Sequence, residues 1–431
     1  MIGISIHNLA IRLWPINRSI TGDGVRETLS IIKEELLDLE LHEIPSGTNV
    51  FDWTIPKEWK VNDAYIITPS GRRICDFKKN NLHLVGYSIP IRKKITLNEL
   101  QKNLHSLPDQ PNAIPYITSY YEARWGFCLS HNERAKLEDG IYEVVIDSNI
   151  FNGALTYADL IIPGDSQQEI LISTYICHPS MANNELSGIC VTTYLAKYVS
   201  KLKHRRYTYR FVFVPETIGS ITYLAQNINH LKSTVEAGFN ITCVGDNRTY
   251  SYLPSRNGHT ISDKIAMHVL KHIYPNYIVY KWADRGSDER QYCSAGADLP
   301  IASIMRSKYG TYSEYHTSED DLINVVTPEG LKGSYNALLL CITALENNQY
   351  PKVNTICEPN LGKRDLYPTL STKFSKSHVQ LLMDFITWAD GQHSMLEIAD
   401  LCERPIWDLY EIRDQLNANG LISITEQRQS S

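Results

Sequence analysis

Two histidines and two carboxylates each follow a predicted strand of the chain. They are His178 after the apolar run 169–177, Glu216 after 207–214, Asp246 after 238–244, and His316 in the tyrosine-rich loop beyond 299–305. Because the carboxyl ends of parallel strands meet at one edge of an α/β sheet, we expect these four side chains to lie close together. Imidazole and carboxylate are the ligands that a catalytic zinc uses, and such a site keeps one position open for water. The pattern therefore predicts a metal centre at this edge.

Each of these residues also has an ordinary structural interpretation. His178 could cap a helix or form a hydrogen bond in the core, and Glu216 could stabilise the dipole of the following helix. Asp246 could form a turn, and His316, which lies among several carboxylates, could belong to solvated ion pairs. The occurrence of all four at strand ends favours a metal site over four separate structural roles.

Two patterns alternate along the chain from about residue 140 to residue 348. Apolar runs typical of buried strands alternate with helical patterns, notably at 217–228, 262–273 and 331–345. Strands that alternate with helices predict an α/β fold with a mostly parallel sheet and helices on both faces. The helical pattern of residues 23–39 supplies a first helix to the same domain.

The remaining segments predict a three-domain chain. Residues 43–137 contain short strand-like runs, turn signals and many aromatic residues, which favours a β-rich domain inserted into the α/β domain of residues 1–42 and 138–350. Residues 351–366 contain prolines without periodicity and are interpreted as a linker. The helical patterns and the final short strand of residues 367–431 predict a winged helix-turn-helix domain.

The composition of the 431-residue chain excludes several classes of protein. Hydrophobic residues make up 43% and charged residues 21%, which is typical of a folded chain and not of a disordered or fibrous one. No apolar run reaches the roughly 18 residues that a membrane span needs, and residues 1–20 do not resemble a signal peptide. The cysteines are scattered, without a C-x-x-C pair, as is typical of buried thiols in a reducing compartment. We therefore expect a cytoplasmic protein that does not bind membranes.

The C-terminal domain carries the wrong charge for binding nucleic acid. Residues 368–425 contain four basic and eight acidic side chains, a net charge of −4, in a chain whose net charge is −6. Neutralising phosphates needs the opposite sign. The predicted recognition helix at 405–417 carries three acidic side chains against Arg413 alone. We therefore expect this domain to contact protein, including a second copy in a homo-oligomer, and not DNA.

The order of these residues resembles the co-catalytic zinc aminopeptidase superfamily, whose members include bacterial leucyl aminopeptidases, glutamate carboxypeptidase and glutaminyl cyclase. The matching positions are His178, Asn184-Glu185-Leu186-Ser187-Gly188, Glu216, Asp246 and Tyr315-His316-Thr317. Three further runs are similar to one bacterial branch: 13–22 (LWPINRSITG), 177–180 (CHPS) and 286–293 (GSDERQYC). That branch has an aminopeptidase-like domain, an inserted domain of unknown function and a C-terminal winged helix. It is often associated with cell-surface polysaccharide biosynthesis.

The resemblance implies a role for each matching position. The implied ligands are His178 for one metal, His316 for the other, Asp246 beside His178, and Asn184 at the position of the bridging aspartate. The paired glutamates of the superfamily, a general base followed by a ligand, correspond to Glu216 and Thr217.

Two positions depart from the superfamily pattern. Asn184 offers a neutral carbonyl where two dications would need an anionic bridge. Glu216, without a second glutamate, cannot be both general base and ligand. We therefore expect one zinc rather than two, held by some of His178, Glu216, Asp246 and His316, and a site without metal stays open. With one zinc, Glu185 or Asp288 is a further candidate base.

The candidate substrate-binding residues lie in loops predicted to face the same edge. They are Arg256, Arg285, Asp288, Arg290 and Tyr315. Arginine and tyrosine side chains suit a substrate with a carboxylate, phosphate or sugar-nucleotide group. Ordinary surface ion pairs are the alternative.

Two functional hypotheses follow. The first is a zinc-dependent hydrolase of an amide or peptide bond, acting on a small-molecule or peptide-like substrate such as an N-acylated precursor of a cell-surface polysaccharide. The second is a non-catalytic binding or scaffold protein that keeps an aminopeptidase-like fold with a degenerate metal site. A transcription factor has only the winged-helix pattern in its favour.

Overall fold

The computed structural model describes residues 1–364, 366 and 373–426, and the side chains of 373–378 are not included. The predicted start of the winged-helix domain at residue 367 and the last residues, 427–431, lie outside the described residues. The chain forms two compact units. The first contains residues 1–263 and 277–336, and the second contains residues 264–276 and 337–431.

An eight-stranded sheet is the centre of the first unit. Its order is β1 (Glu40–Pro45), β10 (Ala154–Ile162), β12 (Thr208–Val214), β11 (Glu169–Tyr175), β13 (Val235–Asn240), β16 (Ile301–Met305), β14 (Ser251–Leu253) and β15 (Ile278–Val279). The four middle strands β12, β11, β13 and β16 run parallel, whereas β10 and β14 join them antiparallel. Every residue of β11 and β16 is buried, as expected for strands covered on both faces. The predicted α/β fold with a mostly parallel core is confirmed.

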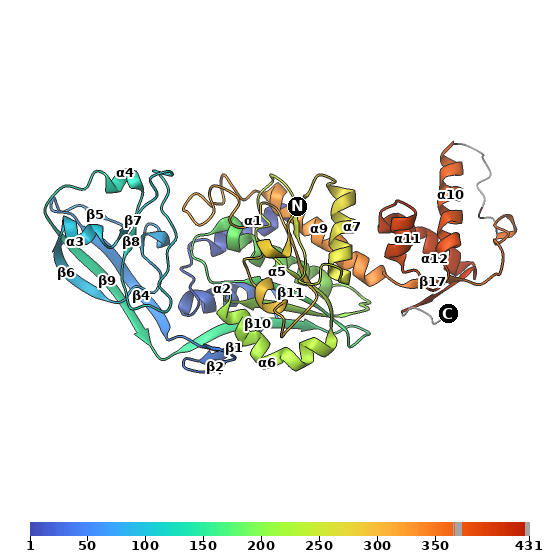
Figure 1. Cartoon of the computed structure of the whole chain (residues 1–431), viewed down its shortest axis with the longest axis horizontal. Helices are drawn as coiled ribbons and strands as arrows, with labels where there is room; N and C mark the ends of the chain where they lie inside the picture. Colours follow the sequence, from blue (N-terminus) through green and yellow to red (C-terminus); the bar gives the residue numbers. More distant parts are fainter. Residues whose placement is uncertain (365, 367–372, 427–431) are drawn as a thin grey trace. The chain divides into compact units, whose positions relative to one another are not determined.

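Helices cover both faces of this sheet. Helix α5 (Ser187–Ser200) packs against α1 (Ile2–Leu13) and α2 (Asp23–Glu35), while α6 (Ile218–Thr234) lies on the other side (Figure 1). Helix α6 also contacts the short helix α8 (Glu289–Tyr292). Helix α1, which the sequence analysis did not predict, buries Ile6, Leu9 and Leu13. Helices α7 (Ile261–Ile273) and α9 (Pro328–Asn347) begin in the first unit and continue into the second, and η3 (Trp282–Asp284) is a single turn of the first unit.

The inserted region has an antiparallel sheet of its own. Its order is β5 (Arg73–Ile74), β4 (Glu58–Ile67), β9 (Ile141–Phe151) and β6 (Ile91–Thr96). The shorter elements are β2 (Asn49–Val50), β3 (Trp53–Thr54), η1 (Asn81–His83), α3 (Leu97–Gln101), β7 (Leu104–His105), β8 (Phe127–Cys128) and α4 (His131–Arg134). Strand β9 pairs with β4 and β6 and then leads directly into β10 of the central sheet (Figure 1). The insert sheet therefore extends past residue 137, where we predicted the insert to end, because one continuous segment serves both sheets.

The second unit contains the winged helix. Its elements are β17 (Tyr350–Val353), η4 (Gly362–Arg364), α10 (Lys373–Trp388), α11 (Met395–Leu401), η5 (Ile406–Leu409), α12 (Tyr410–Ala418) and β18 (Ile422–Thr425). Strand β17 pairs antiparallel with β18, so residues 351–353, predicted to begin a linker, belong to the wing. The missing N–H of Pro351 is tolerated because the pair has only two strands, and both are edges.

Two properties of the whole chain complete the description. Among the residues that the structure describes, none of the helices combines the length and apolar character needed to cross a membrane. The cysteines are free thiols, and all except Cys357 and Cys402 are buried.

Candidate functional site

The loop after β11 contains the first residues of the site. It includes His178 and a turn of π-helix, η2 (Ala182–Leu186), which leads into α5. Such turns occur frequently at functional sites. Gly188 allows α5 to begin this close to the sheet, since a Cβ there would lie 2.5 Å from the carbonyl oxygen of Ile241. The Ser-Gly of the sequence motif is therefore explained by packing.

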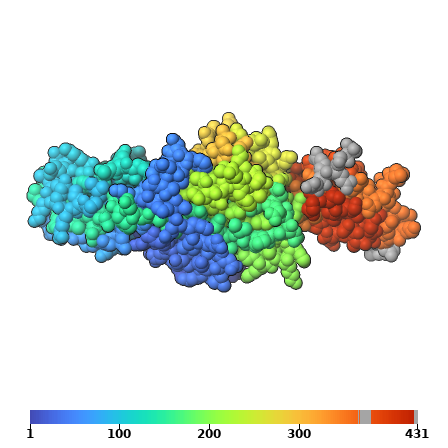
Figure 2. All heavy atoms as spheres, turned by 90° about the horizontal axis from the view of Figure 1, so that it is seen from below, coloured from blue at the N-terminus to red at the C-terminus, as the bar shows by residue number. Residues whose placement is uncertain are grey.

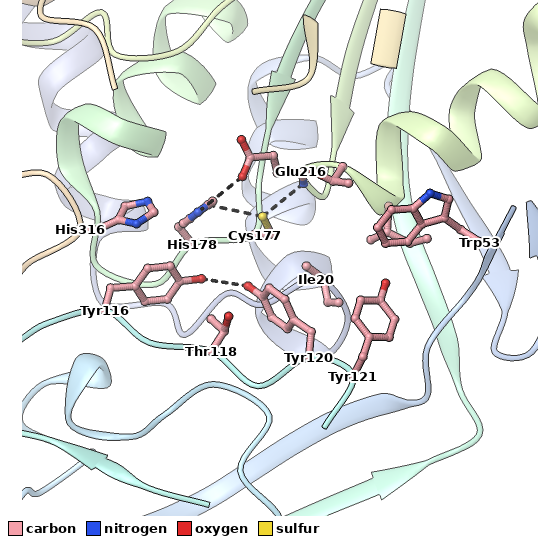
Figure 3. Close-up of a pocket in the computed structure, with 12 residues that line it drawn as sticks. Ile20, Trp53, Tyr116, Thr118, Tyr120, Tyr121, Cys177, His178, Glu216 and His316 are labelled. Carbon is pink, nitrogen blue, oxygen red and sulfur yellow. Dashed lines mark hydrogen bonds and ion pairs between the residues drawn. The ribbon is translucent and has the colours of Figure 1, made fainter. Parts of the chain in front are cut away.

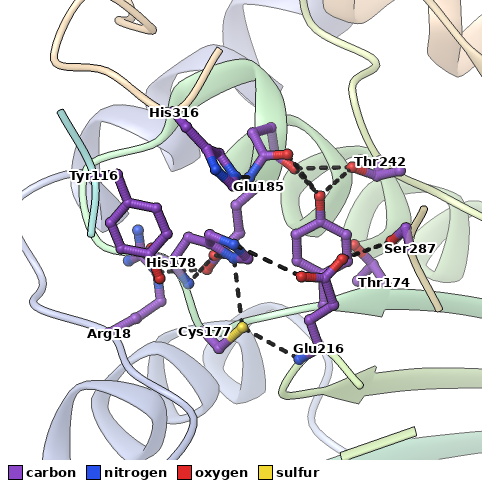
Figure 4. Close-up of polar contacts among 12 residues, drawn as sticks. Arg18, Tyr116, Thr174, Cys177, His178, Glu185, Glu216, Thr242, Ser287 and His316 are labelled. Atoms are coloured by element: carbon purple, nitrogen blue, oxygen red, sulfur yellow. Dashed lines mark hydrogen bonds and ion pairs between the residues drawn. The ribbon is translucent and has the colours of Figure 1, made fainter. Parts of the chain in front are cut away.

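A buried ion pair holds His178 in one orientation (Figure 4). Arg18 Nε donates to Glu185 Oε1 at 2.8 Å, and both side chains are fully buried. Glu185 Oε2 accepts the backbone N–H of His178 and lies 3.0 Å from its Nδ1. A proton on Nδ1 directed at a carboxylate leaves Nε2 as the free ring nitrogen. Glu185, predicted as a candidate base, is thus placed to position His178.

Glu216 faces the free nitrogen of His178. Its Oε2 lies 3.7 Å from His178 Nε2, and its Oε1 accepts a hydrogen bond from Ser287 Oγ at 3.0 Å. Burial raises the pKa of Glu216. Burial alone would lower the pKa of His178, but the hydrogen bond and charge of Glu185, together with the charge of Glu216, raise it. The pKa values of both groups are therefore raised where they face each other at the cavity.

Asp288 is a second buried carboxyl behind Glu216. Its Oδ1 accepts the backbone N–H of Thr217 at 2.7 Å and Ser220 Oγ at 2.8 Å. Burial and the charge of Glu216 raise the pKa of Asp288 to about 8. Its Oδ2 is buried and finds no hydrogen-bond partner among the described residues. Thr217 has φ 64°, a strained value for a β-branched residue, and such strain is often found at functional sites.

His316 completes the polar group. Its ring centroid lies 5.5 Å from that of His178, and it stacks on Tyr315 at 3.8 Å. Burial and the neighbouring His178 lower the pKa of His316 to about 3, so the ring is neutral at physiological pH. Asn184 Nδ2 lies 3.4 Å from His316 Nε2, while Asn184 Oδ1 accepts a hydrogen bond from Tyr175 at 2.9 Å. Asn184 thus presents its amide nitrogen, and not its oxygen, to His316.

The carboxylate of Asp246 is occupied by hydrogen bonds from neighbouring loops. Its carboxylate accepts hydrogen bonds from Asn183 Nδ2 at 3.0 Å, from the Arg248 N–H at 2.9 Å, and from the N–H and Oγ of Ser307 at 2.8 and 3.1 Å. These four donors occupy both carboxylate oxygens, and Asp246 thereby connects the segments of Asn183, Arg248 and Ser307. Of the predicted ligands, the structure brings together His178, Glu216, Asn184 and His316.

The inserted region forms one wall of the cavity in front of these groups. The cavity has a volume of about 300 Å³ and is lined by Ile20, Trp53, Tyr116, Thr118, Tyr120, Tyr121, Cys177, His178, Glu216, Thr217, Ile218 and His316 (Figure 3). The Tyr116 N–H donates to the carbonyl of His316 at 2.9 Å, which connects the insert to the histidine loop. Arg18 and Tyr116 were not among the predicted site residues. The only signals were the run at 13–22 and the aromatic content of the insert.

The predicted substrate-binding residues separate into two groups. Arg256 forms an exposed ion pair with Asp298 at 2.7 Å, and Arg285 lies over the ring of Trp282 at 5.0 Å. Arg290, in contrast, donates to Thr217 Oγ1 at 3.0 Å and is therefore beside the cavity. Asp288 and Tyr315 contact residues that line the cavity, as described above.

Two groups among the described residues have ligand atoms within 4.8 Å of one another: Cys177, His178 and Glu185, and Glu40, His42 and Asp159. In the first group Glu185 is already paired with Arg18, and burial raises the pKa of the Cys177 thiol, which opposes formation of a thiolate. His178, Glu216 and His316 line the cavity, although among the described residues their ligand atoms do not form such a group.

Comparisons with known proteins agree with this fold. A family described as a domain of unknown function, DUF4910, matches residues 7–348, and a winged helix-turn-helix family matches residues 348–424. A Clostridium acetobutylicum protein, named as a candidate polysaccharide biosynthesis protein with an aminopeptidase-like domain, is 46% identical over 92% of this chain and 91% of its own length.

Two solved structures extend the comparison. A crystal structure of a candidate peptidase from Clostridium acetobutylicum has a TM-score of 0.92 at 43% identity, covering 98% of this chain and 96% of that one. A zinc aminopeptidase from Bacillus subtilis has a TM-score of 0.58 at 13% identity, covering 80% and 94%, and shows likeness of fold. The chain therefore belongs to the DUF4910 family, whose α/β domain has the aminopeptidase-like fold and is followed here by a winged helix.

Proposed function

We propose that the protein is a metal-dependent hydrolase that cleaves an amide or peptide-like bond in a small molecule. The observation that carries the proposal is the convergence of His178, Glu216 and His316 on one cavity. The aminopeptidase-like fold supports it. The name of the Clostridium acetobutylicum relative favours a precursor of a polysaccharide as the substrate.

The chemistry of the donors fits one zinc and not two. Two imidazoles and one carboxylate, from His178, His316 and Glu216, are a known catalytic zinc set. A second zinc lacks ligands, because Asn184 is neutral and the carboxylate of Asp246 is bound by four donors. A zinc in this set would lower the pKa of its water toward about 7 and polarise a carbonyl group.

The other residues of the site prepare this chemistry. Glu185 and Arg18 fix the ring of His178, so that Nε2 faces the cavity. Burial and the charge of Glu216 raise the pKa of Asp288 to about 8, so we expect this carboxyl to hold a proton at neutral pH. Aromatic residues of the insert, Trp53, Tyr116, Tyr120 and Tyr121, line one side of the cavity.

Metal analysis tests the proposal. We expect about one zinc per chain after purification without chelators, with most of the metal lost in both His178→Ala and His316→Ala. The exposed His204 provides a matched control, and His204→Ala should retain the metal. Absence of metal in the native protein, together with no effect of added zinc on melting temperature or on amide hydrolysis, would contradict the proposal.

The saturated carboxylate of Asp246 favours a second candidate, a binding protein with a degenerate metal site. The amide oxygen of Asn184 also supports this candidate, because it already accepts a hydrogen bond from the hydroxyl of Tyr175. This candidate predicts a ligand bound in the cavity without turnover. Hydrolysis by the native protein that His316→Ala abolishes would exclude it.

A further inference from the structure

A second cavity adjoins the candidate site. It has a volume of about 320 Å³ and lies between the turn of hairpin β2–β3 and helix α6. Figure 2 shows this part of the surface, with the hairpin in blue beside the yellow-green of α6. Trp53 lines both this cavity and the one that contains His178 and Glu216. The two cavities are therefore neighbours that share the side chain of Trp53.

Helix α6 and the segment that contains Ala297 supply apolar side chains to this cavity. Ile221, Leu224 and Ile228 recur at helical spacing on one face of α6, and Ala297 lies beside them. The polar lining residues are uncharged except for Asp52, and no Lys, Arg or His is among the described residues that line it. An anionic ligand would meet only repulsion there, whereas an apolar chain would be covered.

The hairpin keeps two aromatic side chains exposed at a local cost. Phe51 is 64% exposed and Trp53 is 40% exposed. Phe51 has φ 55° in a two-residue turn, a position where Asn or Gly is preferred and where a bulky side chain is strained. The exposed ring thus does not stabilise the hairpin, and it instead extends the apolar wall of the cavity.

We propose that this cavity is a subsite for an unbranched alkyl chain carried by the substrate. The chain would run from the reacting group at Glu216 past Trp53 and lie between Phe51 and the apolar face of α6. The inference rests on the proposed function in treating the bound molecule as substrate. Its test needs neither metal nor turnover, so failure of the subsite and failure of the hydrolase proposal give different results.

The probe is a series of n-alkyl β-D-glucosides, titrated calorimetrically into the full chain below micelle-forming concentrations. We expect affinity to rise from butyl to octyl glucoside by up to about fourfold for each methylene, which corresponds to about 0.8 kcal/mol per buried methylene. Ile228→Asp places a charge in the cavity and should remove this dependence. Ile11→Asp, at an exposed position of helix α1, is the matched control and should preserve it.

A second variant covers the case in which Ile228→Asp fails to fold. Phe51→Asn suits the left-handed backbone at this position and should fold normally, yet weaken octyl glucoside binding about fivefold or more through loss of the ring. Equal affinity for all chain lengths in the native protein would overturn the subsite. Native octyl glucoside affinity in Phe51→Asn would also overturn it.

Discussion

A fully buried ion pair between Arg18 and Glu185 is the contact on which the orientation of His178 depends. Arg18 also donates to the backbone carbonyls of His178 and Leu13, at 3.2 and 2.8 Å. One side chain thus connects the N-terminal segment with the loop after β11. This contact gives a physical reason for an arginine in the run 13–22 that the sequence analysis singled out.

Removal of Arg18 tests this contact. Arg18→Met leaves the buried charge of Glu185 without its guanidinium partner and with His178 alone, so we expect a loss of about 3–5 kcal/mol in the free energy of unfolding, measured with denaturant. The exposed pair of Arg12 and Glu34 is the matched control, and Arg12→Met should cost at most about 1 kcal/mol. Similar losses of unfolding free energy in the two variants would show that the buried pair contributes no more to stability than the exposed one.

Asp288 makes stability depend on pH. Its pKa in the folded protein is about 8, above the unfolded value of about 3.9, so the folded state keeps a proton that the unfolded state has released. Its stabilising contribution is complete below pH about 4 and is lost as the pH rises through about 8. Asp288→Asn should therefore gain stability relative to the native protein across this window. Denaturant titrations of both proteins at several pH values measure their free energies of unfolding. A difference in unfolding free energy that does not change with pH would contradict the raised pKa of Asp288.

At the scale of elements, the start of helix α5 is set by Gly188. A Cβ at this position would lie 2.5 Å from the carbonyl of Ile241 and 2.6 Å from Thr174 Oγ1. The helix therefore approaches strand β11 and the end of β13 closely enough to place Glu185 and Asn184 in the site. Any larger residue must move η2 and α5 away from the sheet.

Gly188→Ala should destabilise the protein by about 1–3 kcal/mol through overpacking, and it should also reduce zinc retention because η2 moves. Gly296→Ala is the control, since a Cβ at Gly296 meets nothing within 4 Å, and its effect should stay within about 0.5 kcal/mol. Thermal unfolding and metal analysis of both variants provide the comparison. Equal melting temperatures would show that the loop accommodates the methyl group.

The sequence predicted the helices and strands of the α/β domain better than the boundaries of the insert and of the linker. Strands β11, β12 and β16 and helices α2, α6, α7 and α9 lie where apolar runs and helical spacing predicted them. Strand β9 and strand β17 were not predicted. Each pairs with a strand distant in the chain, β4 for β9 and β18 for β17, and periodicity within a segment carries no information about such partners.

At the scale of the whole molecule, the winged helix has the charge of a protein-contact domain. Its net charge of −4 over residues 368–425 opposes phosphate binding. Within the second unit, His268 of α7 contacts Asp400 at 2.7 Å and accepts the N–H of Ile406 at 2.9 Å, so the end of α7 is part of its packing. We propose that this domain contacts protein.

Fluorescence anisotropy with duplex DNA tests the charge argument. We expect no binding at physiological salt, and only weak binding when salt is lowered, because the domain has few Lys and Arg side chains that could displace the counterions of the DNA. Sedimentation of the full chain at increasing concentration, with and without residues 348–431, measures whether the domain mediates self-association. Salt-resistant binding of duplex DNA would overturn the interpretation of this domain.

The sequence by itself determined the α/β fold and the positions of His178, Glu216 and His316 at strand ends, because strand and helix periodicity and the polarity of parallel strands are local properties. Only the tertiary structure decided which of these residues are free to bind a ligand. Glu185 is paired with a residue 167 positions away, Asp246 is bound by Asn183 and Ser307, and the cavity wall comes from the insert. Each of these facts depends on contacts between distant segments, and such contacts exist only after the sheet and its insert have packed together.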